Sequence, residues 1–256
     1  MSKLQVNLIN CLSDNYSYLI FNPDTKKGIV VDPAESKPVI NELKKLNISL
    51  EHIFITHHHA DHVGGNLELK KIFNCKIVGF EGDANRIPGI DIKLRDKENF
   101  EFENETIQLN TAPGHTSGHV FYFFNKNKYA FVGDVVFSLG CGRIFEGTAK
   151  QMFDSVKKIK NLPDETKIFC GHEYTASNSK FCIAYDKENK NLIKRIDQIK
   201  KLRSQNLPTI PTTVLEEKAN NIFFRSDNEQ VISNIGMSGS DEVEIFKKLR
   251  ELKDNF

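Results

Sequence analysis

The segment ITHHHADHVGG, residues 55–65, holds four of the eight histidines in the chain together with an aspartate. It directly follows the apolar run Ile53-Phe54-Ile55, so we predict a strand over His52–Thr56 that ends where the histidines begin. An expression tag does not occur between a strand and a helix, so chance or a tag does not explain the cluster. The position and composition together indicate a site rather than a surface patch.

The spacing inside this segment excludes a helix, because residues two apart on a helix point to roughly opposite sides. In an extended turn, His57 and His59 face the same way, and Asp61 and His62 turn toward a neighbouring point. The pair Gly64-Gly65 then removes side chains where we expect the following helix to approach closely.

Three further polar residues follow predicted strands. They are His115 after the strand Thr106–Thr111, Asp134 after Tyr129–Val132, and His172 after Lys167–Cys170. Loops after strand ends are where α/β folds gather catalytic groups, so we expect one shared site. Its candidate donors are five histidines and two aspartates: His57, His59, Asp61, His62, His115, Asp134 and His172.

Seven donors exceed what one four-coordinate ion uses, but they suit two ions that share a bridging ligand. Asp134 is the natural bridge, because a carboxylate has two oxygens. Nitrogen and oxygen donors of this kind suit zinc, iron or manganese without deciding among them. Of the other histidines, we interpret His52 and His58 as core or surface residues, and His119 either orients a ligand or packs.

The remaining patterns predict an α/β domain followed by a mainly helical one. The predicted elements of the first are a hairpin of Tyr16–Phe21 and Gly28–Val31, strands at Lys76–Phe80 and Val120–Phe124, a helix at Ser36–Leu46 capped by Ser36, and helices around Asn66–Phe73 and Ala149–Leu162. After Thr175 we expect helices at Phe181–Leu202 and Asp241–Leu252, with an extended loop at Leu207–Thr213 between them. We place the domain boundary near residue 174, between domains of residues 1–174 and 175–256.

The composition excludes several classes of protein. Thirty-five Lys plus Arg against thirty-four Asp plus Glu leave a net charge of +1, so no overall field attracts nucleic acid or an anionic membrane. No apolar stretch reaches the roughly 20 residues of a membrane span, and the first ten residues lack a signal-peptide pattern, so we expect a cytoplasmic protein. Five scattered cysteines without a CxxC pair argue against disulfides and thiolate metal sites.

Several longer motifs carry a resemblance to a known family. The pattern HxHxDH at residues 57–62, with His115, Asp134 and His172, resembles the metallo-β-lactamase superfamily. The matches that narrow the resemblance to the glyoxalase II (hydroxyacylglutathione hydrolase) family are THHH at 56–59, PGHTSGH at 113–119, GCGRIFEGT at 140–148, CGHEYT at 170–175 and LRELKDNF at 249–256. The resemblance implies an α/β fold: an αββα sandwich of two mixed sheets, with the metals at one edge and a C-terminal α-helical, substrate-binding domain.

The same resemblance implies a role for each matching residue. It implies one ion on His57, His59 and His115, a second on Asp61, His62 and His172, and Asp134 as the bridge. It implies glutathione contacts at Arg143, Phe145, Tyr174, Arg250 and Lys253. The chain departs from the family pattern at three positions. The family often has Lys where this chain has Arg143 and Tyr where it has Phe145, and a proline is common where this chain has Asn221.

The expected reaction is hydrolysis of S-D-lactoylglutathione to glutathione and D-lactate, within methylglyoxal detoxification. Two divalent ions, zinc first and iron or manganese as alternatives, would supply a bridging hydroxide at neutral pH and polarise the thioester carbonyl. Asp61 is the candidate proton acceptor, which with Asp134 completes the expected catalytic pair. Glutathione carries two carboxylates, a local reason for Arg143, Arg250 and Lys253 in a nearly neutral protein. We expect a monomer acting on this small molecule, without nucleic acid or membrane.

Three alternatives stay open at this point. A persulfide dioxygenase of the superfamily would use a single iron with fewer ligands, whereas Asp61, His62 and His172 together favour two metals. A nuclease of the same fold needs an extended basic surface that the charge balance does not show. A non-catalytic metal-binding protein would tolerate loss of the substrate-side residues, which are present, although Arg250 and Lys253 could also be a solvated helix face.

Overall fold

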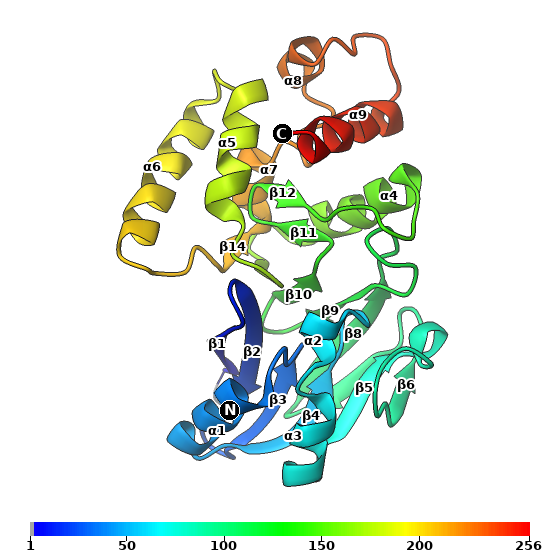
Figure 1. Cartoon of the computed structure of the whole chain (residues 1–256), viewed down its shortest axis with the longest axis vertical. Helices are drawn as coiled ribbons and strands as arrows, with labels where there is room; N and C mark the ends of the chain where they lie inside the picture. Colours follow the sequence, from blue (N-terminus) through cyan, green and yellow to red (C-terminus); the bar gives the residue numbers. More distant parts are fainter. Residues whose placement is uncertain (1–2) are drawn as a thin grey trace. The chain divides into compact units, whose positions relative to one another are not determined.

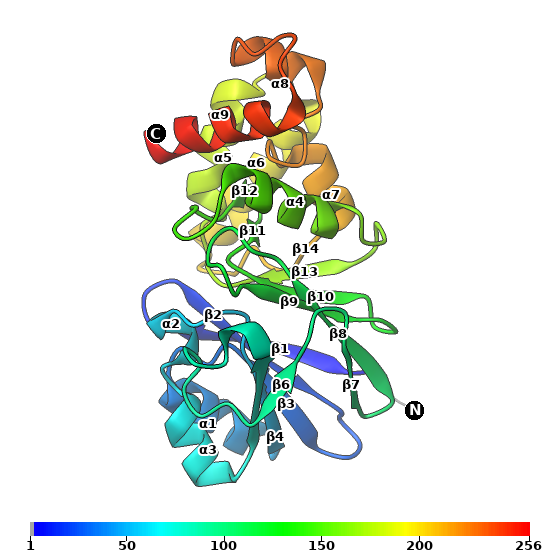
Figure 2. The same ribbon diagram turned by 90° about the vertical axis from the view of Figure 1, so that its right-hand side faces the viewer.

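The structure is a computed structural model that describes residues 3–256. Contacts within the chain divide it into two compact units, one of residues 1–111 with 118–133 and the other of residues 112–117 with 134–256. The elements of both units are labelled in Figure 1 and Figure 2. We describe each unit by itself.

The first unit contains a six-stranded mixed sheet in the order β1-β2-β3-β4-β5-β6. Its strands are β1 (Gln5–Cys11), β2 (Asn15–Phe21), β3 (Lys27–Val31), β4 (Ser49–Phe54), β5 (Lys76–Phe80) and β6 (Ile92–Leu94). The first three pair antiparallel, and β3 to β6 pair parallel. A parallel neighbour requires a crossover, which α1 (Ser36–Leu46) supplies between β3 and β4 and α3 (Asn66–Phe73) between β4 and β5.

Four antiparallel strands form a second layer in the order β10-β9-β8-β7. They are β7 (Asn99–Phe102), β8 (Glu105–Thr111), β9 (Val120–Phe124) and β10 (Tyr129–Gly133). Aromatic rings join the two layers: Tyr122 lies 4.9 Å from Phe54, and Tyr18 lies 5.4 Å from Phe131, between ring centroids. The buried Tyr122 hydroxyl donates to the Ile55 carbonyl at 2.8 Å, and burial raises its pKa well above the usual value. This unit is therefore a β-sandwich.

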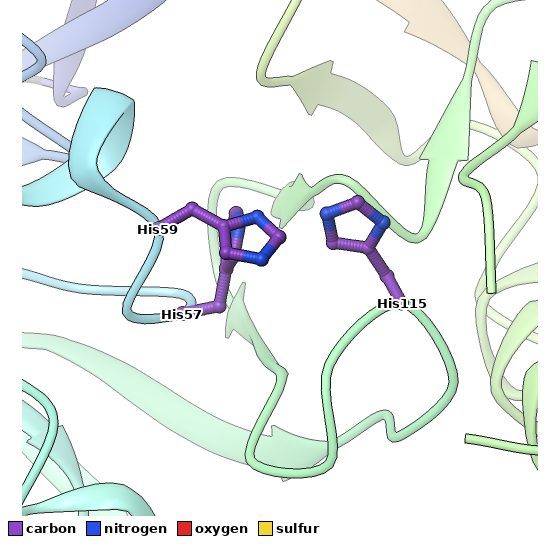
Figure 3. A group of neighbouring side chains, drawn as sticks. All are labelled: His57, His59 and His115. Carbon is purple, nitrogen blue, oxygen red and sulfur yellow. The ribbon is translucent and has the colours of Figure 1, made fainter. Parts of the chain in front are cut away.

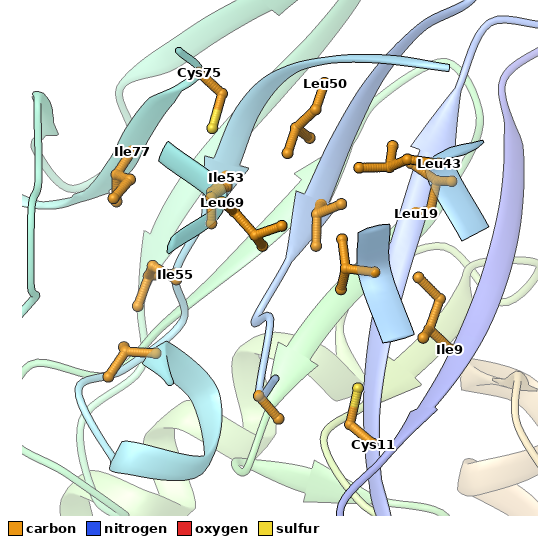
Figure 4. Close-up of a cluster of buried hydrophobic side chains, with 14 of the residues drawn as sticks. Ile9, Cys11, Leu19, Leu43, Leu50, Ile53, Ile55, Leu69, Cys75 and Ile77 are labelled. Carbon is orange, nitrogen blue, oxygen red and sulfur yellow. The ribbon is translucent and has the colours of Figure 1, made fainter. Parts of the chain in front are cut away.

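Helices α1 and α3 cover the other face of the six-stranded sheet (Figure 2). Leu43 of α1 and Leu69 of α3 are buried against sheet residues such as Leu19, Ile53 and Ile77, as Figure 4 shows. Burying an aliphatic side chain of this kind contributes about 1.5–3 kcal/mol each. Packing of these amphipathic helices thus holds the strand ends from which the histidine segment leaves.

The second unit is mainly helical. Its helices are α4 (Ala149–Lys160), α5 (Thr175–Tyr185), α6 (Lys190–Ser204), α7 (Val214–Asn220), α8 (Glu229–Asn234) and α9 (Glu242–Asp254). Its short strands are β11 (Val136–Phe137) paired with β12 (Gly140–Cys141), and β13 (Lys167–Cys170) paired with β14 (Thr212–Thr213). Helices α5 and α6 lie side by side (Figure 1), and the ring of Phe246 on α9 packs 5.6 Å from Phe153 on α4.

Most predicted elements are confirmed, including Lys76–Phe80, Val120–Phe124 and Lys167–Cys170 with the predicted bounds. Three details are wrong. The strand predicted over His52–Thr56 spans Ser49–Phe54, so Ile55 and Thr56 lie outside it. Ser36 is the first helical residue rather than the cap; Glu35 occupies the cap position, and no side chain caps the helix. The helix expected over Phe181–Leu202 is two helices, because the chain turns at Asp186–Asn189, where Asn189 caps α6 through hydrogen bonds from Asn191 and Leu192. No helix within the described residues is long and apolar enough to cross a membrane.

Candidate metal centre

The histidine segment leaves β4 as irregular backbone and then forms a single helical turn, α2 (Ala60–Val63). His57 and His59 lie before that turn, and His57 Nε2 is 3.1 Å from His59 Nδ1, as the predicted common direction requires. The prediction of an extended turn at Asp61 and His62 is wrong, since both lie in α2. Within that turn, Asp61 Oδ2 is 3.7 Å from His62 Nε2, so the two side chains still present their donor atoms together.

The double glycine allows close approach, but to a different partner than expected. A Cβ on Gly64 would lie 2.4 Å from the Ala34 carbonyl oxygen, and a Cβ on Gly65 would lie 2.9 Å from that of Pro33. The backbone that approaches is thus the segment between β3 and α1, whereas the prediction named the following helix. The histidine segment is packed directly onto the chain that leaves β3.

Asp32 is the residue of this region that the sequence analysis missed. It is 3% exposed, and its carboxylate accepts hydrogen bonds from Thr56 N at 2.8 Å, Thr56 Oγ1 at 2.6 Å and His62 Nδ1 at 3.0 Å. Because the carboxylate accepts, His62 carries its proton on Nδ1 and presents the Nε2 lone pair. Asp32 directly follows β3, so the strand-end rule that found the other candidates would have identified it.

Two more side chains orient the same segment. Asn15 donates from Nδ2 to Asp61 Oδ2 at 2.9 Å and to the Asp61 carbonyl at 3.1 Å, which fixes that carboxylate. The ring of His119 is buried and stacks on the ring of His57 at 4.6 Å and 21°. Both alternatives for His119 therefore describe it: it packs, and through that packing it holds the His57 ring.

The second unit brings its three candidates around one oxygen. Asp134 Oδ2 lies 3.5 Å from His115 Nε2 and 3.3 Å from His172 Nε2. All three side chains belong to residues that are 5% exposed. They come from three separate loops, so tertiary structure rather than local sequence assembles this group.

Each imidazole of the second unit has a partner that sets its orientation. His115 donates from Nδ1 to the Arg143 carbonyl at 2.9 Å, which leaves Nε2 as an acceptor. The ring of His172 stacks on Tyr174 at 4.7 Å and 4°, and the ring of Phe137 packs edge-on against Tyr174 at 5.1 Å. Such supports around a ligand raise its basicity and fix its direction.

The donor sets fit metal ions. Two ligands bound to one tetrahedral ion at about 2.0–2.2 Å lie about 3.3–3.6 Å apart, close to the separations measured within each unit. The donor atoms of Asp32, His57 and His62 also lie within 4.8 Å of one another, but Asp32 already accepts three hydrogen bonds and therefore acts as a support. Figure 3 draws three candidate ligands: His57 and His59 from the segment after β4, and His115 from the loop after β8.

The predicted substrate residues of the second unit fall into two groups. Arg143, Phe145 and Tyr174 are accessible, with a side-chain exposure of 70% for Arg143 and residue exposures of 61% and 37% for Phe145 and Tyr174. The Phe145 ring lies 5.1 Å from the His115 ring. Exposed side chains thus stand beside two candidate ligands, where a substrate could reach both.

The remaining pair on α9 is less accessible. Arg250 is 6% exposed and donates from Nη1 to the Cys141 carbonyl at 2.7 Å, and its Nη2 lies 3.0 Å from Asp254 Oδ1. The alternative of a solvated helix face is therefore wrong for Arg250. Lys253 is half-buried over the ring of Phe181, and this burial, with the nearby Arg250, lowers its pKa below the usual value.

The two remaining histidines are accounted for without a ligand role. His58 Nδ1 lies 3.3 Å from Oδ2 of the buried Asp83, whose Oδ1 accepts a hydrogen bond from Arg86 Nε. His52 packs edge-on against Phe100 at 4.9 Å, and burial lowers its pKa. Both observations agree with the interpretation of these residues as core or surface groups.

Models of known protein families match both parts of the chain. The family described as "Metallo-beta-lactamase superfamily" matches residues 13–172, and "Hydroxyacylglutathione hydrolase C-terminus" matches residues 173–256. A hydroxyacylglutathione hydrolase of Pelagibacter ubique (strain HTCC1062) is 49% identical over 99% of this chain and 100% of its own length. Another of Methylococcus capsulatus (strain ATCC 33009 / NCIMB 11132 / Bath) is 43% identical over 99% of each chain.

Solved structures agree on the fold. The crystal structure of ETHE1 from Myxococcus xanthus matches with a TM-score of 0.67 and 22% identity, covering 99% of this chain and 91% of that one. At this identity the likeness supports the fold alone, which is the metallo-β-lactamase fold with a C-terminal helical part. Together with the end-to-end identity to curated relatives, it confirms the predicted resemblance. The chain belongs to the hydroxyacylglutathione hydrolase family, within the metallo-β-lactamase superfamily.

Proposed function

We propose that this chain hydrolyses the thioester of S-D-lactoylglutathione and related S-2-hydroxyacylglutathiones to glutathione and a 2-hydroxy acid. The observation that carries the proposal is Asp134 Oδ2 between the Nε2 atoms of His115 and His172, at 3.5 and 3.3 Å, in a chain related end to end to hydroxyacylglutathione hydrolases. The fold and its His and Asp groups suit divalent metals, whichever substrate is proposed.

Two ions would be held by His57, His59 and His115 and by Asp61, His62 and His172, with Asp134 shared. Zinc is our first choice, because neutral imidazoles and carboxylates fixed at tetrahedral spacing suit it. When bound, the pair would make hydroxide available at neutral pH and polarise the thioester carbonyl. The chain's own contribution is to fix which ring nitrogen of each imidazole is presented, which Asp32 does for His62 and the Arg143 carbonyl does for His115.

Asp61 is the proposed proton acceptor. Its side chain is 38% exposed, whereas that of its neighbour His62 is 1% exposed, so water can reach the carboxylate. Asn15 donates to Asp61 Oδ2 and thereby fixes the direction of the carboxylate. A proton acceptor must lie within hydrogen-bond reach of the water it deprotonates, and a ligand of the same ion satisfies that condition.

The substrate would be held on the second unit. Arg143 and Lys253 are cationic and accessible or half-buried, which suits the two carboxylates of glutathione. Phe145 and Tyr174 present rings beside His115 and His172, where they would contact the glutathione moiety. Arg250 would contribute mainly by holding the Cys141 backbone under this surface.

We further propose a cytoplasmic monomer that degrades methylglyoxal-derived thioesters, with a catalytic domain of residues 1–174 and a substrate-binding domain of residues 175–256. Limited proteolysis tests that boundary, because the compact units place residues 134–174 with the C-terminal part. Size-exclusion chromatography with light scattering tests the oligomeric state.

The decisive experiment combines metal analysis with an assay on one purified sample. We expect close to two metal ions per chain and release of glutathione from S-D-lactoylglutathione. Sulfite production from glutathione persulfide, without thioesterase activity, would instead support the dioxygenase alternative. A metal-loaded protein with neither activity would leave only the non-catalytic alternative.

A further inference from the structure

The loop that carries the exposed Arg143 and Phe145 runs alongside the loop that carries His115. Both belong to the second unit. The Arg143 carbonyl accepts from His115 Nδ1 at 2.9 Å, Phe145 N donates to the His115 carbonyl at 3.3 Å, and Gly147 N donates to the Gly114 carbonyl at 3.1 Å. Residues 143–147 are therefore joined to residues 114–115 along their length.

Glu146 extends this connection with a side chain. Its Oε2 accepts hydrogen bonds from both Ser117 N and Ser117 Oγ, each at 2.8 Å. Hydrogen bonds to an ionised carboxylate are roughly twice as strong as neutral ones. Since Ser117 lies two residues after His115, these bonds hold the far end of the loop on which that imidazole stands.

The two loops also lie so close together that two glycine positions have no room for a Cβ atom. A Cβ on Gly147 would lie 2.6 Å from Gly114 Cα, and a Cβ on Gly142 would lie 1.9 Å from the Asp134 carbonyl oxygen. Residues 142–147 thus touch the backbone at both His115 and Asp134. A displacement of this segment would be felt by two candidate ligands at once.

Both ends of the segment are anchored elsewhere. Thr148 caps α4 in a reciprocal pair with Gln151, and Arg250 holds the Cys141 carbonyl at 2.7 Å. Between these anchors, Glu146 is the ionised side chain that ties the segment to the His115 loop. Its removal would leave the ends and the backbone hydrogen bonds in place but loosen the middle, where Arg143 and Phe145 stand.

We propose that Glu146 is a positioning residue that couples the glutathione-contacting segment to the metal ligand His115. The coupling rests on the proposed function of the surrounding site. Because binding free energies are reciprocal, glutathione held by the segment should tighten metal binding, and bound metal should tighten glutathione. Glu146 itself touches neither substrate nor metal; it acts through Ser117 and the two loops.

The test compares Glu146→Ala and Glu146→Gln with the wild type and with Glu165→Ala, an exposed glutamate of the same unit. Zinc affinity is measured by competition with a chromophoric chelator, with and without saturating glutathione, and thermal melts of the metal-free proteins check folding. We expect Glu146→Ala to weaken zinc binding by about tenfold, as supports around a ligand typically do, and to raise KM about threefold. Glu146→Gln, which keeps an acceptor without the charge, should fall between.

The zinc-affinity measurements with glutathione distinguish a positioning role of Glu146 from a general loss of stability. In the wild type and in Glu165→Ala, glutathione should tighten zinc several-fold; in Glu146→Ala this gain should be lost. Zinc affinity within twofold of the wild type, or an undiminished glutathione effect in Glu146→Ala, would overturn the proposal. If the wild type binds zinc but does not hydrolyse the thioester, the proposed function fails while the affinity comparison still decides the role of Glu146.

Discussion

The ligand segment of the first unit and the three ligand loops of the second solve the same problem by different means. Residues 57–62 carry four candidate ligands in six positions, and buried side chains behind them, above all Asp32, aim their rings. In the second unit His115, Asp134 and His172 stand on separate loops; the backbone of a neighbouring loop orients His115, and the Tyr174 ring supports His172. The orientation of candidate ligands that are neighbours in the chain thus depends on the side chains packed beneath them. The orientation of candidate ligands on separate loops, the dispersed set, depends on contacts between the loops.

The largest effect should come from the shared oxygen of the dispersed set. Asp134→Ala removes the carboxylate that lies between two imidazoles, so we expect loss of at least one ion and a fall in kcat/KM of more than about 100-fold, because even residues behind a ligand cost 10–100-fold. Metal analysis and the thioesterase assay measure both. Unchanged metal content would show that Asp134 is not shared between ions.

The next largest effect should come from Asp32, which lies beneath the contiguous segment of the first unit. Asp32→Asn replaces one acceptor oxygen by a donor amide, which conflicts with the three donors around it and loosens His62. We expect metal affinity to fall about 10–100-fold. The exposed Asp197→Asn is the matched control. Equal metal affinity in the two variants would mean that the contiguous segment aims itself.

The same contrast explains how far the sequence alone could lead. The segment 57–62 was readable because its ligands are neighbours in the chain and follow one apolar strand. The grouping of His115, Asp134 and His172 was anticipated only from strand ends and family resemblance, since no local pattern links residues so far apart. Asp32 obeyed the strand-end rule but, as one acidic residue before a proline, carried no further signal.

The burial of individual side chains on α9 could not be predicted from the sequence either. Arg250 and Lys253 lie one helical turn apart on α9, and their spacing does not distinguish a solvated face from a packed one. The structure buries the first against the Cys141 backbone and leaves the second half-exposed, because Phe181 fills the space beneath it. The break between α5 and α6 was missed for a similar reason, since the cap at Asn189 lies within an otherwise helical pattern.

A smaller effect is expected on the substrate side of the second unit. Lys253→Ala would remove the proposed ion pair with a glutathione carboxylate, which we expect to be equal in the ground and transition states, so KM should rise about tenfold while kcat changes little. Steady-state kinetics on S-D-lactoylglutathione give both constants. A large loss of kcat at constant KM would contradict the assignment, because it would mean that Lys253 acts only in the transition state.

The pH dependence of KM should be smaller still. Burial and the neighbouring Arg250 lower the pKa of Lys253, so its charge is lost at a lower pH than in an exposed lysine. We expect KM to rise as the pH increases through that lowered pKa toward 10.5, the ordinary value, while Lys253→Ala shows a flatter profile over the same range. Parallel profiles for the two proteins would exclude this lysine as the titrating group.

The smallest effect concerns the thiols. All five cysteines are free, as predicted, and the structure buries them; burial raises the pKa of Cys75 and Cys141 to about 11 and of Cys182 to about 12. Because the thiolate is the reactive form, iodoacetamide should alkylate the native protein slowly and leave its activity nearly unchanged. Mass spectrometry follows the labelling. Rapid labelling of Cys141 would mean that the contact between loops opens readily.

The glycine at 142 has a practical consequence for anyone who wishes to redesign the acyl-group range of this enzyme. Every other residue would place a Cβ 1.9 Å from the Asp134 carbonyl oxygen, so variation there would displace a candidate metal ligand before it altered the substrate contacts. Mutant libraries should therefore keep 142 and 147 constant and diversify 143 and 145, whose side chains are exposed.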